Sequence, residues 1–154
     1  TTAIHGLDLL GRKVMMKNGK AVMLLMQEVM QDIAKAKQHE NTKAHATTLE
    51  KKLGQLQELS MHLMTVAQKE GVEVYLSDAT LYLELFGTIV LGWLWLKMTN
   101  TCNENESIDK TFAESKFLCC NYFFEYELPK TEGLFTRLKS TNRVTVGIDS
   151  KLID

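Results

Sequence analysis

The segment LYLELFGTIVLGWLWLKM, residues 81–98, is apolar on every side when it is drawn as a helix. Such a helix needs apolar neighbours all round, which a membrane or the centre of a protein supplies. Glu84 lies inside the run, and a carboxylate in mid-bilayer costs about 3 kcal/mol. The uninterrupted apolar part, 86–96, is short for a membrane span and contains Gly87 and Gly92. We therefore predict the central helix of a bundle, with other helices approaching closely at the two glycines.

Three further segments place apolar residues every three or four positions, which is the pattern of a helix with one buried face. They span residues 7–14, 22–33 and 49–66, and polar residues cover their opposite faces. The sequence KNGK at 17–20 and the polar stretch at 37–43 favour turns between them. We therefore predict three amphipathic helices that are joined by short connections.

A fifth helix is predicted from the apolar residues of segment 112–128. Ser107 or Asp109 can cap its first turn, and Pro129, the single proline of the chain, is expected to end or kink it. Residues 140–154 show no helical periodicity and are predicted to form a short irregular tail. Long helices with short connections predict an all-α fold, an up-and-down antiparallel helical bundle.

The charges of the chain nearly balance. Lys and Arg number 18, Asp and Glu number 19, and the net charge is −1. Nucleic-acid binding needs an excess of positive charge to neutralise phosphates, so no nucleic-acid partner is expected. The cysteines are Cys102, Cys119 and Cys120, an odd number with two adjacent, which is not a disulfide framework. We expect reduced thiols and a cytoplasmic location.

Residue patterns typical of catalysis or metal binding are missing from the sequence. A di-iron bundle needs a glutamate three residues before an inward histidine. No such glutamate precedes any of the four histidines, which are His5, His39, His45 and His62. There is also no glycine-rich phosphate loop and no Ser/His/Asp set. The sequence thus predicts no catalytic residue and no metal site in this chain.

The first stretch of the chain, TTAIHGLDLLGRKV, resembles acyl-CoA dehydrogenases just after their YEG turn, where members read YEGTxxIQxLDLLGRK. The matching positions are Thr1, Thr2, Ile4, Leu7, Asp8, Leu9, Leu10, Gly11, Arg12 and Lys13. Segments 81–98 and 112–130 are similar to the additional C-terminal helical domain of the long bacterial-type members, with its LxLFGxxxxGWxW helix and a helix ending in ELP. The chain therefore resembles a fragment of such an enzyme, from Thr1 to about Leu138.

This resemblance implies a division of the chain into three parts. Residues 1–17 would be the end of the dehydrogenase helical domain, 18–139 the accessory helical bundle, and 140–154 the tail. The family's base, the Glu of YEG, would lie just upstream of Thr1, so no catalytic residue is expected in the chain. Thr1 and Thr2 match positions that approach the diphosphate–adenosine part of FAD in the intact enzyme.

The resemblance also implies the activity of the parent protein. The intact enzyme would use FAD to oxidise an acyl-CoA to its 2,3-enoyl form and pass electrons to an electron-transfer flavoprotein. The fragment would bind no cofactor itself, and would pack against the rest of the dehydrogenase chain or support a homo-oligomer such as a dimer. The alternative is a helical interaction module that binds a protein or, less expected, a membrane surface through the 82–95 face or the 144–153 tail.

Overall fold

The computed structural model describes residues 1–14, 20–142 and 144–152 of the chain. Within these ranges the ordered elements are helical and no strand is present, which confirms the predicted all-α fold. The elements are α1 (Thr2–Asp8), the π-helical turn η1 (Leu9–Lys13), α2 (Lys20–Ala36), α3 (Lys43–Glu70), α4 (Val72–Leu76), α5 (Ala79–Glu104), α6 (Lys110–Tyr122), the π-helical turn η3 (Phe123–Glu127), the 3-10 turns η4 (Leu128–Lys130) and η5 (Ser150–Leu152), and α7 (Thr131–Lys139).

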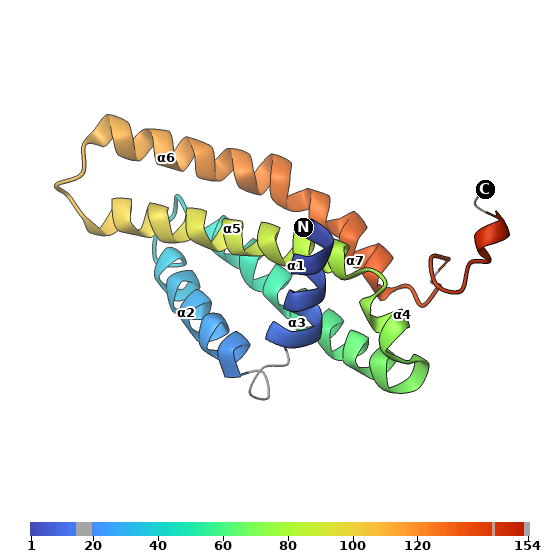
Figure 1. The fold of residues 1–154 in the computed structure, drawn as a ribbon. Coiled ribbons are helices and arrows are strands. Elements are labelled where there is room, and N and C mark those ends of the chain that lie inside the picture. Colours follow the sequence, from blue (N-terminus) through green and yellow to red (C-terminus); the bar gives the residue numbers. More distant parts are fainter. Residues whose placement is uncertain (15–19, 143, 153–154) are drawn as a thin grey trace.

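Helix α5 is the central element of the bundle. Five other helices, α1, α2, α3, α6 and α7, pack against it. In Figure 1, α6 runs back along one side of α5, while α2 and α3 lie on the other side and α1 crosses near its first half. The prediction of a central helix is therefore confirmed, and its apolar character follows from the number of neighbours that it serves.

The longest helix, α3, buries the stripe that its sequence predicts. Leu49, Leu56, Leu59 and Leu63 follow one another at intervals of seven, three and four positions and are almost completely buried in the core. Each leucine removed from water contributes about 1.5–3 kcal/mol to folding before entropy is subtracted. Gly71 ends the helix with a φ angle of 96°, a backbone conformation that residues with a side chain rarely adopt.

The two glycines of α5 differ in their surroundings. A Cβ built on Gly92 would lie 3.4 Å from Leu49 Cδ1 and 3.5 Å from Phe123 Cε1, so α3 and η3 do approach the helix closely there. A Cβ on Gly87 would meet nothing within 4 Å. Within the described residues, the predicted close approach is therefore confirmed at Gly92 and wrong at Gly87.

The observed helix ends agree in part with those predicted from the sequence. Asp109 caps α6, since its carboxylate accepts a hydrogen bond of 2.9 Å from the Phe112 N–H. The connection predicted at 37–43 separates α2 from α3, whereas residues 17–19 of the turn predicted at 17–20 lie outside the described residues. Pro129 falls inside the 3-10 turn η4. The chain changes from α to π to 3-10 geometry around Pro129 and then continues as α7.

The C-terminal segment extends away from the bundle (Figure 1). In its described residues, 140–142 and 144–152, the only regular element is the turn η5. This arrangement agrees with the predicted irregular tail.

Candidate functional site

One face of the central helix is left uncovered by the residues that the structure describes. Leu91, Leu94 and Met98 follow one another at three- and four-residue spacing and are exposed by 51, 44 and 40%. Residues with this spacing share one side of a helix. We call these three residues the open face of α5. The prediction that neighbours surround α5 is therefore wrong on this side.

The length and composition of α5 would by themselves allow it to cross a membrane. Of its most apolar 18-residue window, 39% is buried inside the protein. Tyr82, Leu85, Ile89 and Leu96 are almost inaccessible to solvent, and Glu84 is exposed. The buried positions favour the core helix of a globular bundle, and the open face is the part of α5 that remains to be covered.

Helix α1 lies directly on the first half of α5. A Cβ on Gly6 would come within 2.8 Å of the Ala79 carbonyl oxygen, so the two backbones are in contact. The Tyr75 hydroxyl donates a hydrogen bond of 2.8 Å to the Leu10 carbonyl and fixes η1, the continuation of α1. Ile4, on the same helix as Gly6, is exposed. Both α1 and α5 therefore present apolar side chains to solvent.

The sequence profile of the acetyl-CoA dehydrogenase C-terminal-like family matches residues 25–149, most of the chain. The chain belongs to this family. The matched range includes α3, α5 and α6 of this C-terminal-like domain in full. A search of the curated proteins found no match. The match leaves out residues 1–24, so the relation of segment 1–14 to the dehydrogenase body stays a prediction, as do the boundaries at residues 17 and 139.

The predicted cofactor contacts lie at the start of the chain, outside the residues that the family profile matches. Thr1 and Thr2 are both exposed. Thr1 is the N-cap residue of α1; its carbonyl accepts from the His5 N–H at 3.0 Å, and its hydroxyl makes no capping hydrogen bond. Two exposed hydroxyls at a helix start suit a phosphate contact but do not form a flavin site without further residues. Their cofactor role stays a prediction.

Several polar contacts join helices of the domain to one another. The buried Lys52 ammonium of α3 donates to the Glu132 carboxylate of α7 at 2.5 Å and lies 5.3 Å from the centre of the Phe135 ring. This hydrogen bond lowers the pKa of Glu132. Among the described residues, no three His, Cys, Asp or Glu side chains are grouped so that they could hold a metal ion. The Lys52–Glu132 contact thus joins α7 to α3.

Sequence reasoning missed the open face of α5. It offered the 82–95 face only as an alternative docking surface. Tyr82 and Trp93 are buried in the core, so they cannot serve that purpose. The spacing of Leu91, Leu94 and Met98 was visible, but it is one of several apolar stripes on a helix that is apolar all round.

Proposed function

We propose that the chain is the accessory C-terminal domain of a flavin-dependent acyl-CoA dehydrogenase, and that its role is structural. The intact enzyme would use FAD to convert an acyl-CoA to the 2,3-enoyl-CoA, with electrons passing to an electron-transfer flavoprotein. The family membership supports the parent enzyme. The grouping of buried polar residues into interhelical contacts supports a packing role for this part.

The observation that carries the proposal is the open face of α5. Leu91, Leu94 and Met98 lie on the helix that organises the whole bundle. Exposed apolar side chains in a row are typical of a surface that another part of a protein covers. The dehydrogenase body, or the same domain of a second subunit, would cover these residues and keep the domain attached.

The first test compares the flavin content of two purified proteins, this chain and the full product of its gene. We expect the full product to be yellow and to bleach on addition of an acyl-CoA, and this chain to be colourless. A full product that binds no flavin would overturn the proposal. If the full product is yellow but no acyl-CoA bleaches it, the proposal that the parent is a flavoprotein stands, and the proposed acyl-CoA dehydrogenase activity is wrong.

A second test concerns the open face. In the full product, Leu94→Lys should weaken the attachment of this domain and increase its cleavage by protease. The matched control is Leu118→Lys on α6, an exposed leucine that is not part of the open face. Equal protease sensitivity of the two variants would show that the open face is not covered by the parent protein.

The open face is also compatible with the alternative function, an interaction module that binds a separate protein. This alternative would apply if the gene encoded no dehydrogenase body. Binding to lipid vesicles at low salt would favour the membrane form of the module. If the chain stays in the supernatant when the vesicles are sedimented, the membrane-binding alternative is wrong.

A further inference from the structure

Segment 144–149, which follows the last α-helix of the bundle, has the composition of a β-strand. It reads VTVGID, and four of its six residues are β-branched. Valine, isoleucine and threonine favour extended backbone and are less suited to helices. Val144, Val146 and Ile148 occupy every second position, which places them on one side of a strand. We call 144–149 the tail segment.

The apolar residues of the tail segment are not covered by the bundle. Val144 is exposed by 68% and Ile148 by 45%. The segment follows α7 and extends away from the helices (Figure 1). Disordered segments are poor in apolar residues and rich in charge, whereas this one carries a single charged residue, Asp149. Its composition therefore indicates a segment that becomes ordered by contact with another surface.

The backbone of the tail segment also has unused hydrogen-bonding groups. Within residues 144–148, no backbone N–H donates to another described residue. The described residues contain no strand, so they offer no sheet edge to this segment. An extended segment satisfies its backbone by adding to the edge of an existing sheet, where main-chain hydrogen bonds give affinity and alternate side chains give specificity. Such a sheet has to lie outside the described residues.

The present conformation of the tail segment is compatible with a change to a strand. The segment is irregular, and Gly147 has a φ angle of 75°. A glycine moves from this region to extended backbone at little cost, because it has no side chain that could clash. Six extended residues span about 20 Å, which is the length of an ordinary strand.

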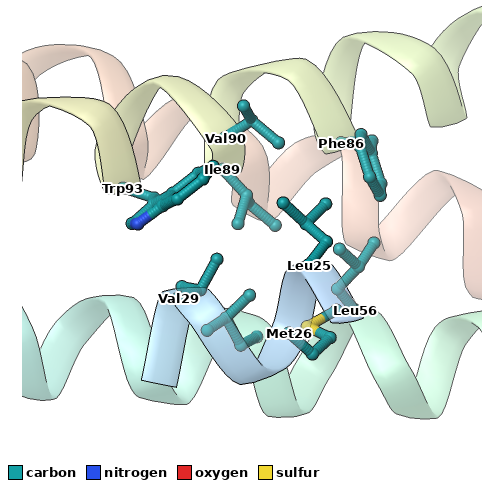
Figure 2. Close-up of a pocket in the computed structure, with 9 residues that line it drawn as sticks. Leu25, Met26, Val29, Leu56, Phe86, Ile89, Val90 and Trp93 are labelled. Carbon is teal, nitrogen blue, oxygen red and sulfur yellow. The ribbon is translucent and has the colours of Figure 1, made fainter. Parts of the chain in front are cut away.

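The interior of the bundle has no room for the tail segment between α2, α3 and α5. Figure 2 shows Val29 of α2, Leu56 of α3 and Trp93 of α5 around a void of only about 10 Å³. A void of this size holds about one water molecule. The apolar side of the tail segment cannot be buried there and needs a surface elsewhere.

The family profile includes the tail segment. Its match continues beyond α7 and ends at residue 149, the last residue of the segment. The tail segment is therefore part of the domain that defines the family, and not an extension added to it.

The tail segment of a second copy is a poor partner. Two such segments would form a ribbon of two strands, and a ribbon of this kind is marginally stable at best in water. A strand that joins a larger sheet instead packs its apolar side against a core that already exists. The side that carries Val144, Val146 and Ile148 suits this second arrangement.

We propose that the tail segment adds as a β-strand to the free edge of a β-sheet in the parent protein, outside this chain. Val146 and its two apolar neighbours on the same side pack on the apolar face of that sheet, and Thr145 faces solvent. The proposal rests on the proposed function only in requiring a larger parent protein. It gives the domain a second point of attachment, formed by other residues than the open face of α5.

Hydrogen exchange in the full product of the gene, resolved to single residues by mass spectrometry, tests the proposal. A strand at the new edge of a sheet pairs every second N–H with its neighbour and leaves the others in water. We expect alternate amides of the tail segment to exchange at least about tenfold more slowly than in an unstructured peptide of the same sequence. In this chain alone, all of them should exchange freely.

Two adjacent substitutions in the full product test which side of the strand is buried. Val146→Asp places a carboxylate on the apolar side, and we expect it to abolish the protection of the tail segment. Thr145→Asp is the matched control on the opposite side and should leave the protection in place. Neither residue belongs to the hydrophobic core, so both variants should keep the helix content of the natural protein in circular dichroism.

The proposal is wrong if the tail segment exchanges freely in the full product, or if Val146→Asp and Thr145→Asp have equal effects. Protection of consecutive instead of alternate amides would indicate a helix and would also contradict it. Protection in this chain alone would show that the tail segment pairs with a second copy or folds back on its own bundle, which again excludes the proposed sheet.

The flavin content of the same sample separates this proposal from the proposed function. A full product without flavin but with alternate protection of the tail segment would leave the strand in place and contradict the flavoprotein. A yellow full product with a freely exchanging tail segment would do the reverse.

Discussion

The indole N–H of Trp93 donates a hydrogen bond of 2.7 Å to the carboxylate of Asp32, which joins the central helix α5 to α2. The backbone carbonyl of Asp32 accepts from the Asn100 amide at 2.8 Å. Lys97 lies 3.9 Å from the same carboxylate. Polar contacts thus hold the C-terminal half of α2 against α5.

Replacing Trp93 by phenylalanine should destabilise the domain. The ring would still fill much of the space, but the Asp32 carboxylate would lose its indole donor. Hydrogen bonds to charged groups contribute about 1.5–3 kcal/mol, so we expect the free energy of unfolding to fall by about 2 kcal/mol. Urea denaturation measures this change. Trp95→Phe, on the half-buried side of α5, is the matched control and should cost less; equal losses would show that the hydrogen bond contributes little.

The Lys52–Glu132 pair should make stability depend on pH. The hydrogen bond from Lys52 lowers the pKa of Glu132 below its ordinary value of 4.5. The pair therefore stabilises the fold above that value, and its contribution is lost as the pH falls through the lower pKa of the folded state. Because Glu132 is largely exposed, the contribution is under about 1 kcal/mol.

Glu132→Gln tests this dependence by urea denaturation at about pH 7 and about pH 3. The variant should be less stable than the natural chain near neutrality, and this difference should shrink at the lower pH as the natural carboxyl takes up its proton. A constant difference across the two pH values would rule out the ion pair as its cause.

Two glycine-to-alanine changes should have opposite signs. At Gly6 the new Cβ would lie 2.8 Å from the Ala79 carbonyl oxygen, so α1 must move away from α5. We expect a loss of about 1–3 kcal/mol. At Gly54 the space is open, and alanine favours the helix by up to about 1 kcal/mol. Thermal unfolding compares the two; a stabilising Gly6→Ala would show that α1 does not pack tightly on α5.

The adjacent cysteines should differ in reactivity although they share a peptide bond. Cys119 is exposed and Cys120 is buried, since neighbouring positions on a helix point in different directions. Burial raises the pKa of the Cys120 thiol to about 11. A thiol reagent added to the folded chain should label Cys119 quickly and Cys120 only after unfolding. Comparable labelling of both under native conditions would contradict the packing of α6 on α5.

The helices with a clear apolar period could be predicted from the sequence. The stripe of leucines at 49–66 predicts the buried face of α3, although the helix extends from Lys43 to Glu70, and the apolar run of α5 identifies the central helix. Helix α4, Val72–Leu76, escaped prediction because five residues show too little of any period. The open face of α5 also escaped, since a helix that is apolar on all sides does not reveal which side its neighbours leave uncovered.

The exposure of Met30 on α2 could not be predicted for a different reason. The sequence predicts a buried stripe on α2 that includes Val29, Met30 and Ile33. In the structure Val29 and Ile33 are buried, whereas Met30 is exposed. The distance between two helices depends on the fit of all their neighbours, which local periodicity does not record.

The central place of α5 has a consequence for how the protein is made. Helices α1, α2 and α3 precede α5 in the chain, and all three pack against it. A ribosome therefore completes them before their common partner exists. Their apolar sides stay in contact with water or chaperones until α5 has left the exit tunnel, so folding to the final bundle waits for the second half of the chain.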